Sequence, residues 1–133
     1  MAREKENNGT VERDRTPRPF LKWVGGKSQI LGEIRQLYPD TFEKYHEPFI
    51  GGGAVFFDLL PKKAIISDSN KELINCYKIV KSKAPLLIEK LQEHVYDKDR
   101  YYAVRDEDPR KLDPITRAAR TIYLNRTGFN GLY

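Results

Sequence analysis

Three consecutive glycines at positions 51–53 constrain the fold of this chain more than any other feature of its sequence. The residues before them, 45–50, predict a short strand, and the apolar residues after them, 54–60, predict a buried helix. A second short strand is predicted at 63–67. The order strand, glycine turn, helix, strand is the opening of a doubly wound α/β fold. Two strands are too few for a stable parallel sheet, so we expect this chain to be the first part of a longer protein.

Apolar residues at helical spacing predict a helix over 27–38 and another helix after the second strand. The second of these helices is expected to begin with a capping box, in which the side chains of Ser69 and Glu72 satisfy free amides of the first turn. One face of that helix carries Leu73, Cys76, Tyr77 and Val80.

Prolines mark the expected starts of two further helices. Pro85 precedes an apolar run, and the pair Asp113-Pro114 combines a capping side chain with a residue suited to the first turn. A helix is also predicted around 101–104. Gly128 is expected to end the last helix with a positive φ angle.

The composition indicates a soluble chain with one modest core, since 39% of the residues are hydrophobic and 32% are charged. No apolar run of about eighteen residues is present, which excludes a membrane span. Residues 1–18 are polar and mixed in charge, and they predict a flexible tail rather than a secretory signal. The single cysteine, Cys76, excludes an internal disulfide and a zinc site of the usual kind, so we expect a reducing cytoplasm and no metal.

The net charge of +5 favours an anionic partner, and nucleic acid is the commonest partner of that kind. The 24 basic residues are interspersed with 19 acidic ones, and ordinary solubility is the alternative explanation of such a balance. Charge alone therefore leaves both interpretations open.

The glycine turn and Asp68 form the first candidate binding site. Glycines after a strand let a ligand approach the backbone, and the following helix offers free N–H groups to a carboxylate or phosphate. Asp68 follows Gly51 by 17 residues, near the separation of about 20 between the glycine turn and the ribose-binding acid of nucleotide-binding folds. The alternative is a plain turn, with Asp68 capping the next helix. Because Ser69 is expected to cap that helix, we predict that the Asp68 carboxyl is free for a ligand.

Lys27 lies in a second candidate, the sequence GGKS at 25–28, which is similar to a phosphate-binding loop. Such a loop requires a glycine where this chain has Leu21. A nucleotide-binding protein is therefore kept as an alternative function. A solvated lysine in the first turn of a helix is the simpler interpretation of Lys27.

The segment 125–132, NRTGFNGL, concentrates groups that suit nucleic acids. Arg126 suits a phosphate or a guanine, the asparagines suit an adenine edge, and Phe129 suits stacking on a base. The alternative is a helix C-terminus in which Arg126 pairs with the last carbonyl groups. A non-catalytic nucleic-acid-binding module is a further alternative function.

Four segments, in order, resemble the Dam-type (D12 class) DNA adenine N6-methyltransferases. Residues 19–27, PFLKWVGGK, look like the N-terminal motif of that family. Residues 47–53, EPFIGGG, look like its S-adenosylmethionine glycine motif, and residues 66–70, ISDSN, resemble its ribose-binding strand end. Residues 123–132, YLNRTGFNGL, are similar to the segment that begins DNA target recognition.

The resemblance implies a Rossmann-like fold that binds S-adenosylmethionine, followed by the start of a helical target-recognition region. It also implies transfer of a methyl group from that cofactor to N6 of adenine in double-stranded DNA. Within this family Asp68 would bind the ribose hydroxyls, and Trp23 would offer an aromatic surface. The implied cofactor-binding residues are Trp23, Lys27, Glu47, Pro48, Phe49, Gly51, Gly53 and Asp68.

The same resemblance implies a DNA-binding set and a location in the cytoplasm, associated with the nucleoid. Phe129 would insert near the adenine, which an enzyme acting on a base takes out of the stack. Lys22 would face the DNA, and Asn130, with Asn125 and Arg126 nearby, would help to position the recognition loop. The implied DNA-binding residues are Lys22, Asn125, Arg126, Phe129 and Asn130.

One motif of the family is absent from this sequence. Asp-Pro-Pro-Tyr, which binds the adenine amino group, follows the recognition region in that family, and an Arg expected after the Gly-Leu pair is also missing. We therefore expect a flexible tail at 1–18, part of the cofactor-binding domain at 19–95 and the start of the recognition region at 96–133. Without the motif, we expect the chain to be inactive alone.

Overall fold

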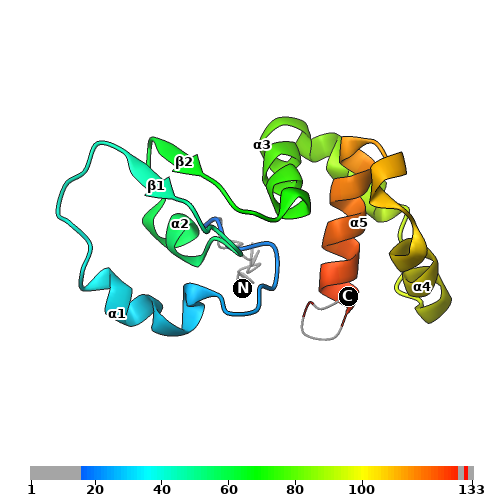
Figure 1. The fold of residues 1–133 in the computed structure, drawn as a ribbon, viewed down its shortest axis with the longest axis horizontal. Helices are drawn as coiled ribbons and strands as arrows, with labels where there is room; N and C mark the ends of the chain where they lie inside the picture. The colour runs from blue at the N-terminus through cyan, green and yellow to red at the C-terminus, as the bar shows by residue number, and fades with distance from the viewer. Residues whose placement is uncertain (1–15, 129–130, 132–133) are drawn as a thin grey trace, which may run out of the picture.

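The computed structural model describes residues 16–128 and Gly131 (Figure 1). Two short strands, β1 (Tyr45–Glu47) and β2 (Ala64–Ile66), form a parallel sheet, and helix α2 (Ala54–Leu59) connects them. The expected order of strand, glycine turn, helix and strand is therefore confirmed, with each strand shorter than predicted.

The register of the sheet brings the carboxyl ends of the two strands side by side. His46 lies opposite Ile65. Beyond the strands, the Ser67 N–H donates to the Glu47 carbonyl oxygen at 2.9 Å, and the Ile50 N–H donates to the Ser67 carbonyl oxygen at 3.1 Å. The glycine turn and Asp68 follow directly, so both begin at the same edge of the sheet.

The first helical segment is shorter than predicted. A 3-10 turn, η1 (Lys27–Ile30), continues into α1 (Leu31–Arg35), and the chain then leaves the helix. The N–H groups of residues 36–38 donate to carbonyl groups only three residues earlier. Such bonds tighten the end of a helix, and Pro39 has no N–H with which to continue it, so the prediction of a helix as far as residue 38 is wrong.

The longest helix, α3 (Lys71–Gln92), contains a kink. Lys83 has φ −141° and ψ 34°, which lie outside the helical region, and Pro85 follows in the first turn of the second half. Proline is tolerated in a first turn because its missing N–H would be unpaired there. The predicted start of a new helix at Pro85 is therefore confirmed as a break within α3.

The main core lies where α3 packs against α5 (Pro114–Thr127). Cys76 and Ala118 are both fully buried, and burial raises the pKa of the Cys76 thiol to about 12. Val80, predicted on the buried face of α3, is 36% exposed, and Ile79 is buried instead. The buried residues of this core are Leu21, Ile50, Leu73, Cys76, Ile79, Leu87, Ala118 and Ala119.

Polar side chains join the remaining helices to this core. Arg120 is buried on α5, and its guanidinium donates to the carbonyl oxygens of Val104 (2.9 Å) and Arg105 (2.7 Å), near the C-terminus of α4 (Lys98–Asp106). A short 3-10 turn, η2 (Pro109–Lys111), leads from α4 towards α5. The carbonyl groups at the end of α4 thereby gain the partners that a helix end lacks.

The two ends of α5 test two expectations. Asp113 caps the N-terminus, because its Oδ1 accepts from the N–H groups of Ile115 (3.0 Å) and Thr116 (3.1 Å), as predicted. Gly128 ends the helix with φ −75°, so the predicted positive φ is wrong. Its N–H donates to the Leu124 carbonyl oxygen at 2.8 Å with the backbone extended, and no left-handed residue is required.

Figure 1 shows the sheet with α1 and α2 at one end of the molecule, and α3, α4 and α5 at the other. Leu21 and Ile50 belong to the sheet end, yet both are buried in the α3–α5 core. The predicted division of the chain at residue 95 stays a prediction. Among the helices of residues 16–128, none is long and apolar enough to cross a membrane.

The buried face of α3 leads to a stability prediction. Leu73 is fully buried, so Leu73→Ala is expected to lower the free energy of unfolding by about 2–5 kcal/mol, because it removes buried apolar surface and leaves a cavity. Urea denaturation followed by circular dichroism measures the loss. Leu86→Ala on the same helix is the matched control, because Leu86 is 49% exposed and should lose much less. Equal losses in the two variants would contradict the packing described here.

Candidate functional site

The glycine turn after β1 adopts backbone angles that favour glycine. Gly51 has φ 51° and Gly53 has φ 78°, both in the left-handed region. The turn is closed by the Gly53 N–H, which donates to the Ile50 carbonyl oxygen at 2.9 Å, and α2 begins at the next residue. Residues with a Cβ are strained at such angles, which explains why glycine occupies these two positions.

Aromatic side chains of the protein itself pack closely against this turn. A Cβ atom added to Gly51 would lie 2.8 Å from Cδ1 of Trp23, and one added to Gly53 would lie 2.7 Å from the Tyr77 hydroxyl oxygen. The Tyr77 hydroxyl also donates to the Gly51 carbonyl oxygen at 3.0 Å. A plain turn or the approach of a ligand was the predicted reason for these glycines, and in the structure Trp23 and Tyr77 also require them.

Asp68 contacts the same turn from the end of β2. Its Oδ2 accepts from the Gly51 N–H at 3.0 Å, and its Oδ1 accepts from the Asn70 N–H at 3.0 Å. This carboxyl was predicted to be free for a ligand, and in the structure it already has two protein donors. Each carboxylate oxygen has two acceptor sites, so one on each remains for a further donor.

The cap of α3 is Asn70, and the predicted capping box is wrong. The Asn70 side-chain oxygen accepts from the N–H groups of Glu72 (3.0 Å) and Leu73 (3.1 Å). The Glu72 carboxylate instead forms an ion pair with Arg117 of α5. Asparagine and serine are about equally good caps, so the choice between adjacent residues depends on where β2 ends.

Lys27 and Glu47 form an ion pair beside the turn. The Lys27 ammonium lies 3.3 Å from Oε1 of Glu47 and donates to the Phe49 carbonyl oxygen at 2.9 Å. Glu47 is buried, and its other carboxylate oxygen accepts from the Tyr45 hydroxyl. Burial, together with this hydrogen bond to Glu47, raises the pKa of Tyr45. Lys27 thus joins η1 to β1 and keeps a partly exposed charge at the site.

The residues between β1 and the turn differ in exposure. Phe49 is 74% exposed, so its ring presents an apolar face to solvent next to the glycine turn. The Pro48 carbonyl oxygen accepts from the Ser67 hydroxyl at 3.2 Å, which further joins the two strand ends. All eight predicted cofactor-binding residues therefore belong to β1, the turn, or segments in contact with them.

The predicted DNA-binding residues differ in position. The side chains of Lys22 and Arg126 are exposed, whereas Asn125 is only 2% exposed. The Asn125 carboxamide pairs with the main chain of Lys22, so these two are in direct contact. Phe129 and Asn130 lie outside the described residues.

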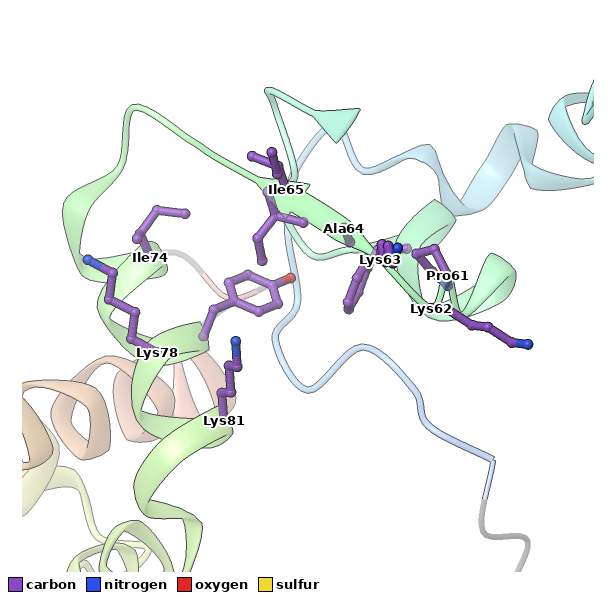
Figure 2. A pocket seen from close by; sticks show the side chains of 11 residues that line it. Pro61, Lys62, Lys63, Ala64, Ile65, Ile74, Lys78 and Lys81 are labelled. Carbon is purple, nitrogen blue, oxygen red and sulfur yellow. The ribbon is translucent and has the colours of Figure 1, made fainter. Parts of the chain in front are cut away.

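A separate pocket of about 720 Å³ lies between β2 and α3 and is lined by none of the predicted site residues. Figure 2 shows Lys78 and Lys81 of α3 on one side, and Lys62 and Lys63 before β2 on the other. Ile65 and Ile74 supply apolar surface. The glycine turn, rather than this pocket, is therefore the candidate site that the sequence predicted.

Tyr77 is the residue of the site that the sequence analysis missed. Its position on the apolar face of α3 was predicted, but not its hydrogen bond to the turn. Burial raises the pKa of Tyr77, and Glu47 and Asp68 act in the same direction. A tyrosine on an otherwise apolar helix face, which needs a partner for its hydroxyl, was the available signal.

The geometry of the turn predicts how glycine substitutions behave. Gly51→Ala is expected to lower the free energy of unfolding by roughly 1–3 kcal/mol, because the new Cβ is strained and meets the Trp23 ring. Trp23 is the single tryptophan of the chain, so its fluorescence should change as well.

Two glycines outside the turn are matched controls. Gly25 also has a positive φ, but a Cβ there has no neighbour within 4 Å. Gly25→Ala should therefore lower the free energy of unfolding by about 1 kcal/mol, through backbone strain alone. Gly32 lies in α1, and a Cβ there also has no neighbour within 4 Å. Gly32→Ala should raise the free energy of unfolding by up to about 1 kcal/mol, because alanine favours a helix over glycine. If Gly51→Ala behaves like Gly32→Ala, the described turn is wrong.

Comparison with known proteins identifies relatives over most of the chain. The chain is 48% identical over 122 residues to a type II methyltransferase of Lactococcus lactis subsp. cremoris. The aligned segment covers 87% of this chain and 43% of that protein. It is 44% identical to a type II methyltransferase of Methanocaldococcus jannaschii, covering 87% of this chain and 47% of the relative. A DNA adenine methylase of Escherichia coli (strain K12) is 38% identical, and the aligned segment covers 86% of this chain and 42% of that protein.

This chain therefore spans less than half the length of each of these relatives. The model of one family matches residues 23–133, which include the glycine turn, Asp68 and α5. The resemblance drawn from the four sequence segments is confirmed. The chain belongs to the D12 class N6 adenine-specific DNA methyltransferases.

Proposed function

We propose that this chain supplies the methyl-donor-binding turn and part of the DNA-binding surface of a site-specific DNA adenine N6-methyltransferase. The observation that carries the proposal is the hydrogen bond between the Asp68 carboxylate and the Gly51 N–H, at the carboxyl ends of two parallel strands. In open α/β sheets, ligands bind at this edge. A Rossmann-like arrangement of the whole domain is part of the same proposal.

The groups around the turn fit the three chemical parts of S-adenosylmethionine. Asp68 is partly exposed and has acceptor sites left for ribose hydroxyls. The exposed ring of Phe49 suits the adenine base. Lys27, which is paired with the buried Glu47, keeps a partly exposed cation beside the turn, and this cation suits the carboxylate of the amino-acid end. The cofactor supplies a methyl group already activated by its sulfonium, so the protein mainly binds and orients it.

The DNA part of the proposal depends on the exposed side chains of Lys22 and Arg126. The exposed ammonium of Lys22 and the guanidinium of Arg126 suit phosphates, and the net charge of +5 has the appropriate sign. Phe129 is proposed to insert near the target adenine, because chemistry on a base requires its removal from the stack, and Asn130 is proposed to help position the recognition loop. Double-stranded DNA is therefore the proposed partner.

Binding of S-adenosylmethionine tests the cofactor proposal directly. Titration calorimetry on the purified chain should detect binding, and Asp68→Ala should weaken the affinity by roughly ten- to a hundredfold, as expected for lost hydrogen bonds to a charged group. Asp106→Ala on α4 is the control, because Asp106 is exposed and remote from the turn.

Asp68 also holds the Gly51 N–H, so its replacement affects the fold of the turn as well as the affinity. Thermal unfolding without ligand measures the first effect separately. Asp68→Asn keeps an acceptor and should unfold closer to the wild type, while still binding more weakly. If the wild-type chain is folded and titration calorimetry detects no binding of S-adenosylmethionine, the cofactor proposal is wrong.

The salt dependence of DNA binding tests the second part. If Lys22 and Arg126 contact phosphates, replacing either with Ala should reduce the slope of log affinity against log salt by about 0.9. Arg110→Ala removes the same charge from an exposed residue paired with Asp108, and it should leave the slope unchanged. Fluorescence anisotropy with a labelled duplex measures these slopes. Equal slopes in all three variants would exclude the assigned contacts.

A further inference from the structure

Asn125 is a polar side chain that α5 withdraws almost completely from water. Its carboxamide pairs with the main chain of Lys22, which lies 103 residues earlier. The Lys22 N–H donates to Oδ1 at 2.8 Å, and Nδ2 donates to the Lys22 carbonyl oxygen at 2.7 Å. A third bond joins Nδ2 to the Gly131 carbonyl oxygen at 3.4 Å. The two shorter bonds reproduce the exchange between directly opposed residues of an antiparallel strand pair.

Lys22 requires such a partner because it lies outside any helix or strand. Leu21 is buried in the core, and Trp23 is half-buried against the glycine turn. The bonds of the Lys22 main chain to Asn125 are partly buried, while Lys22 as a whole is exposed. N–H and carbonyl groups that are withdrawn from water destabilise a fold unless they are paired, and Asn125 supplies both partners.

The same carboxamide lies between the two candidate surfaces. On one side, Trp23 adjoins Lys22 and covers Gly51, the residue that Asp68 holds. On the other side, a Cβ added to Gly131 would lie 2.9 Å from Nδ2 of Asn125 and 3.0 Å from Cβ of Lys22. A short, packed series of contacts therefore leads from the turn, through Lys22, to the C-terminal end of α5.

We infer that Asn125 is a positioning residue, which holds Lys22 and Trp23 in register with the end of α5 and does not itself contact DNA. This inference rests on the proposed function, and it deepens that function by separating the support of Lys22 from the contact made by its ammonium. The described partners of the Asn125 carboxamide are all main-chain atoms, and its burial leaves no edge for a base.

An isosteric substitution separates hydrogen bonding from packing. Asn125→Asp keeps the shape but loses the Nδ2 donor, so at neutral pH a carboxylate faces the carbonyl oxygens of Lys22 and Gly131. The emission of Trp23 should then shift to longer wavelength, and its quenching by acrylamide should increase. Burial and the two facing carbonyls favour the protonated form and should raise the pKa of the new carboxyl.

Acidification should therefore reverse the effect. The protonated carboxyl donates again, so the emission should return towards that of the wild type as the pH falls to about 5. Lys22 and Arg126 are the charged neighbours of residue 125 across the contact and along the chain. The wild type, measured at each pH, corrects for the titration of other groups. The matched control is Asn75→Asp on α3, since Asn75 Nδ2 donates to the Pro114 carbonyl oxygen at 2.8 Å, at the opposite end of α5. It should not move the Trp23 emission.

A measurement without mutation guards against variants that fail to fold. Hydrogen exchange of the wild-type chain, followed by NMR, should show the Lys22 amide protected, although this residue belongs to no helix or strand. An unprotected Lys22 amide would overturn the inference. An Asn125→Asp protein whose Trp23 emission matches the wild type at every pH from about 5 to about 9 would overturn it as well.

DNA binding distinguishes this inference from the proposed function. At neutral pH, Asn125→Asp should bind a duplex roughly tenfold more weakly than the wild type and recover relative to it on acidification. Lys22→Ala should also weaken binding, but its Trp23 emission should match the wild type, because Ala keeps the main-chain groups. A wild type that binds neither DNA nor cofactor would overturn the proposed function and reduce Asn125 to a structural residue. The emission and exchange results would still report whether its contact with Lys22 exists.

Discussion

The absence of a side chain at Gly51 is the constraint on which the candidate site depends. With φ 51°, the main chain of Gly51 directs its N–H to Asp68 and its carbonyl oxygen to Tyr77, while the Trp23 ring covers the place that a Cβ would occupy. Three segments that are distant in sequence thereby meet on the backbone of one residue. The end of β2, helix α3 and the N-terminal segment are positioned together, because each of them contacts Gly51.

The two carboxylates of the site differ in how their charge is accommodated. Asp68 is partly exposed, and its carboxylate accepts from two backbone N–H groups. The side chain of Glu47 is only 8% exposed, and its burial is offset by the Lys27 ammonium and by the Tyr45 hydroxyl. Since the ammonium of Lys27 also donates to the Phe49 carbonyl oxygen, one cation supports both the acid and the chain that leads into the turn.

Local patterns predicted the elements of this fold, while contacts between distant segments escaped them. The glycine turn, the start at Pro85 and the Asp113 cap depend on neighbouring residues, and all three were visible in the sequence. The capping of α3 by Asn70 depends on the last residue of β2, which a pattern locates only within a residue or two.

Long-range pairing explains the remaining differences. The partners of Asn125 and Tyr77 lie 103 and 26 residues away, and no spacing rule within one element points to them. Burial by tertiary packing also decides that Ile79 rather than Val80 faces the core. The roles of the site residues in binding were drawn from the family resemblance, and the residues alone left them open.

The lysines around the pocket between β2 and α3 have a consequence for the behaviour of the chain in solution. Within the described residues, β1 and β2 pair only with each other, and an unpaired outer edge of such a sheet can pair with the edge of another copy. Ile65, which is 59% exposed, adds apolar surface that favours this association. Two copies meeting there would bring Lys62, Lys63, Lys78 and Lys81 of each into close approach. Mutual repulsion of these cations opposes such association. Added salt screens the charges, so it should promote self-association of this protein rather than prevent it.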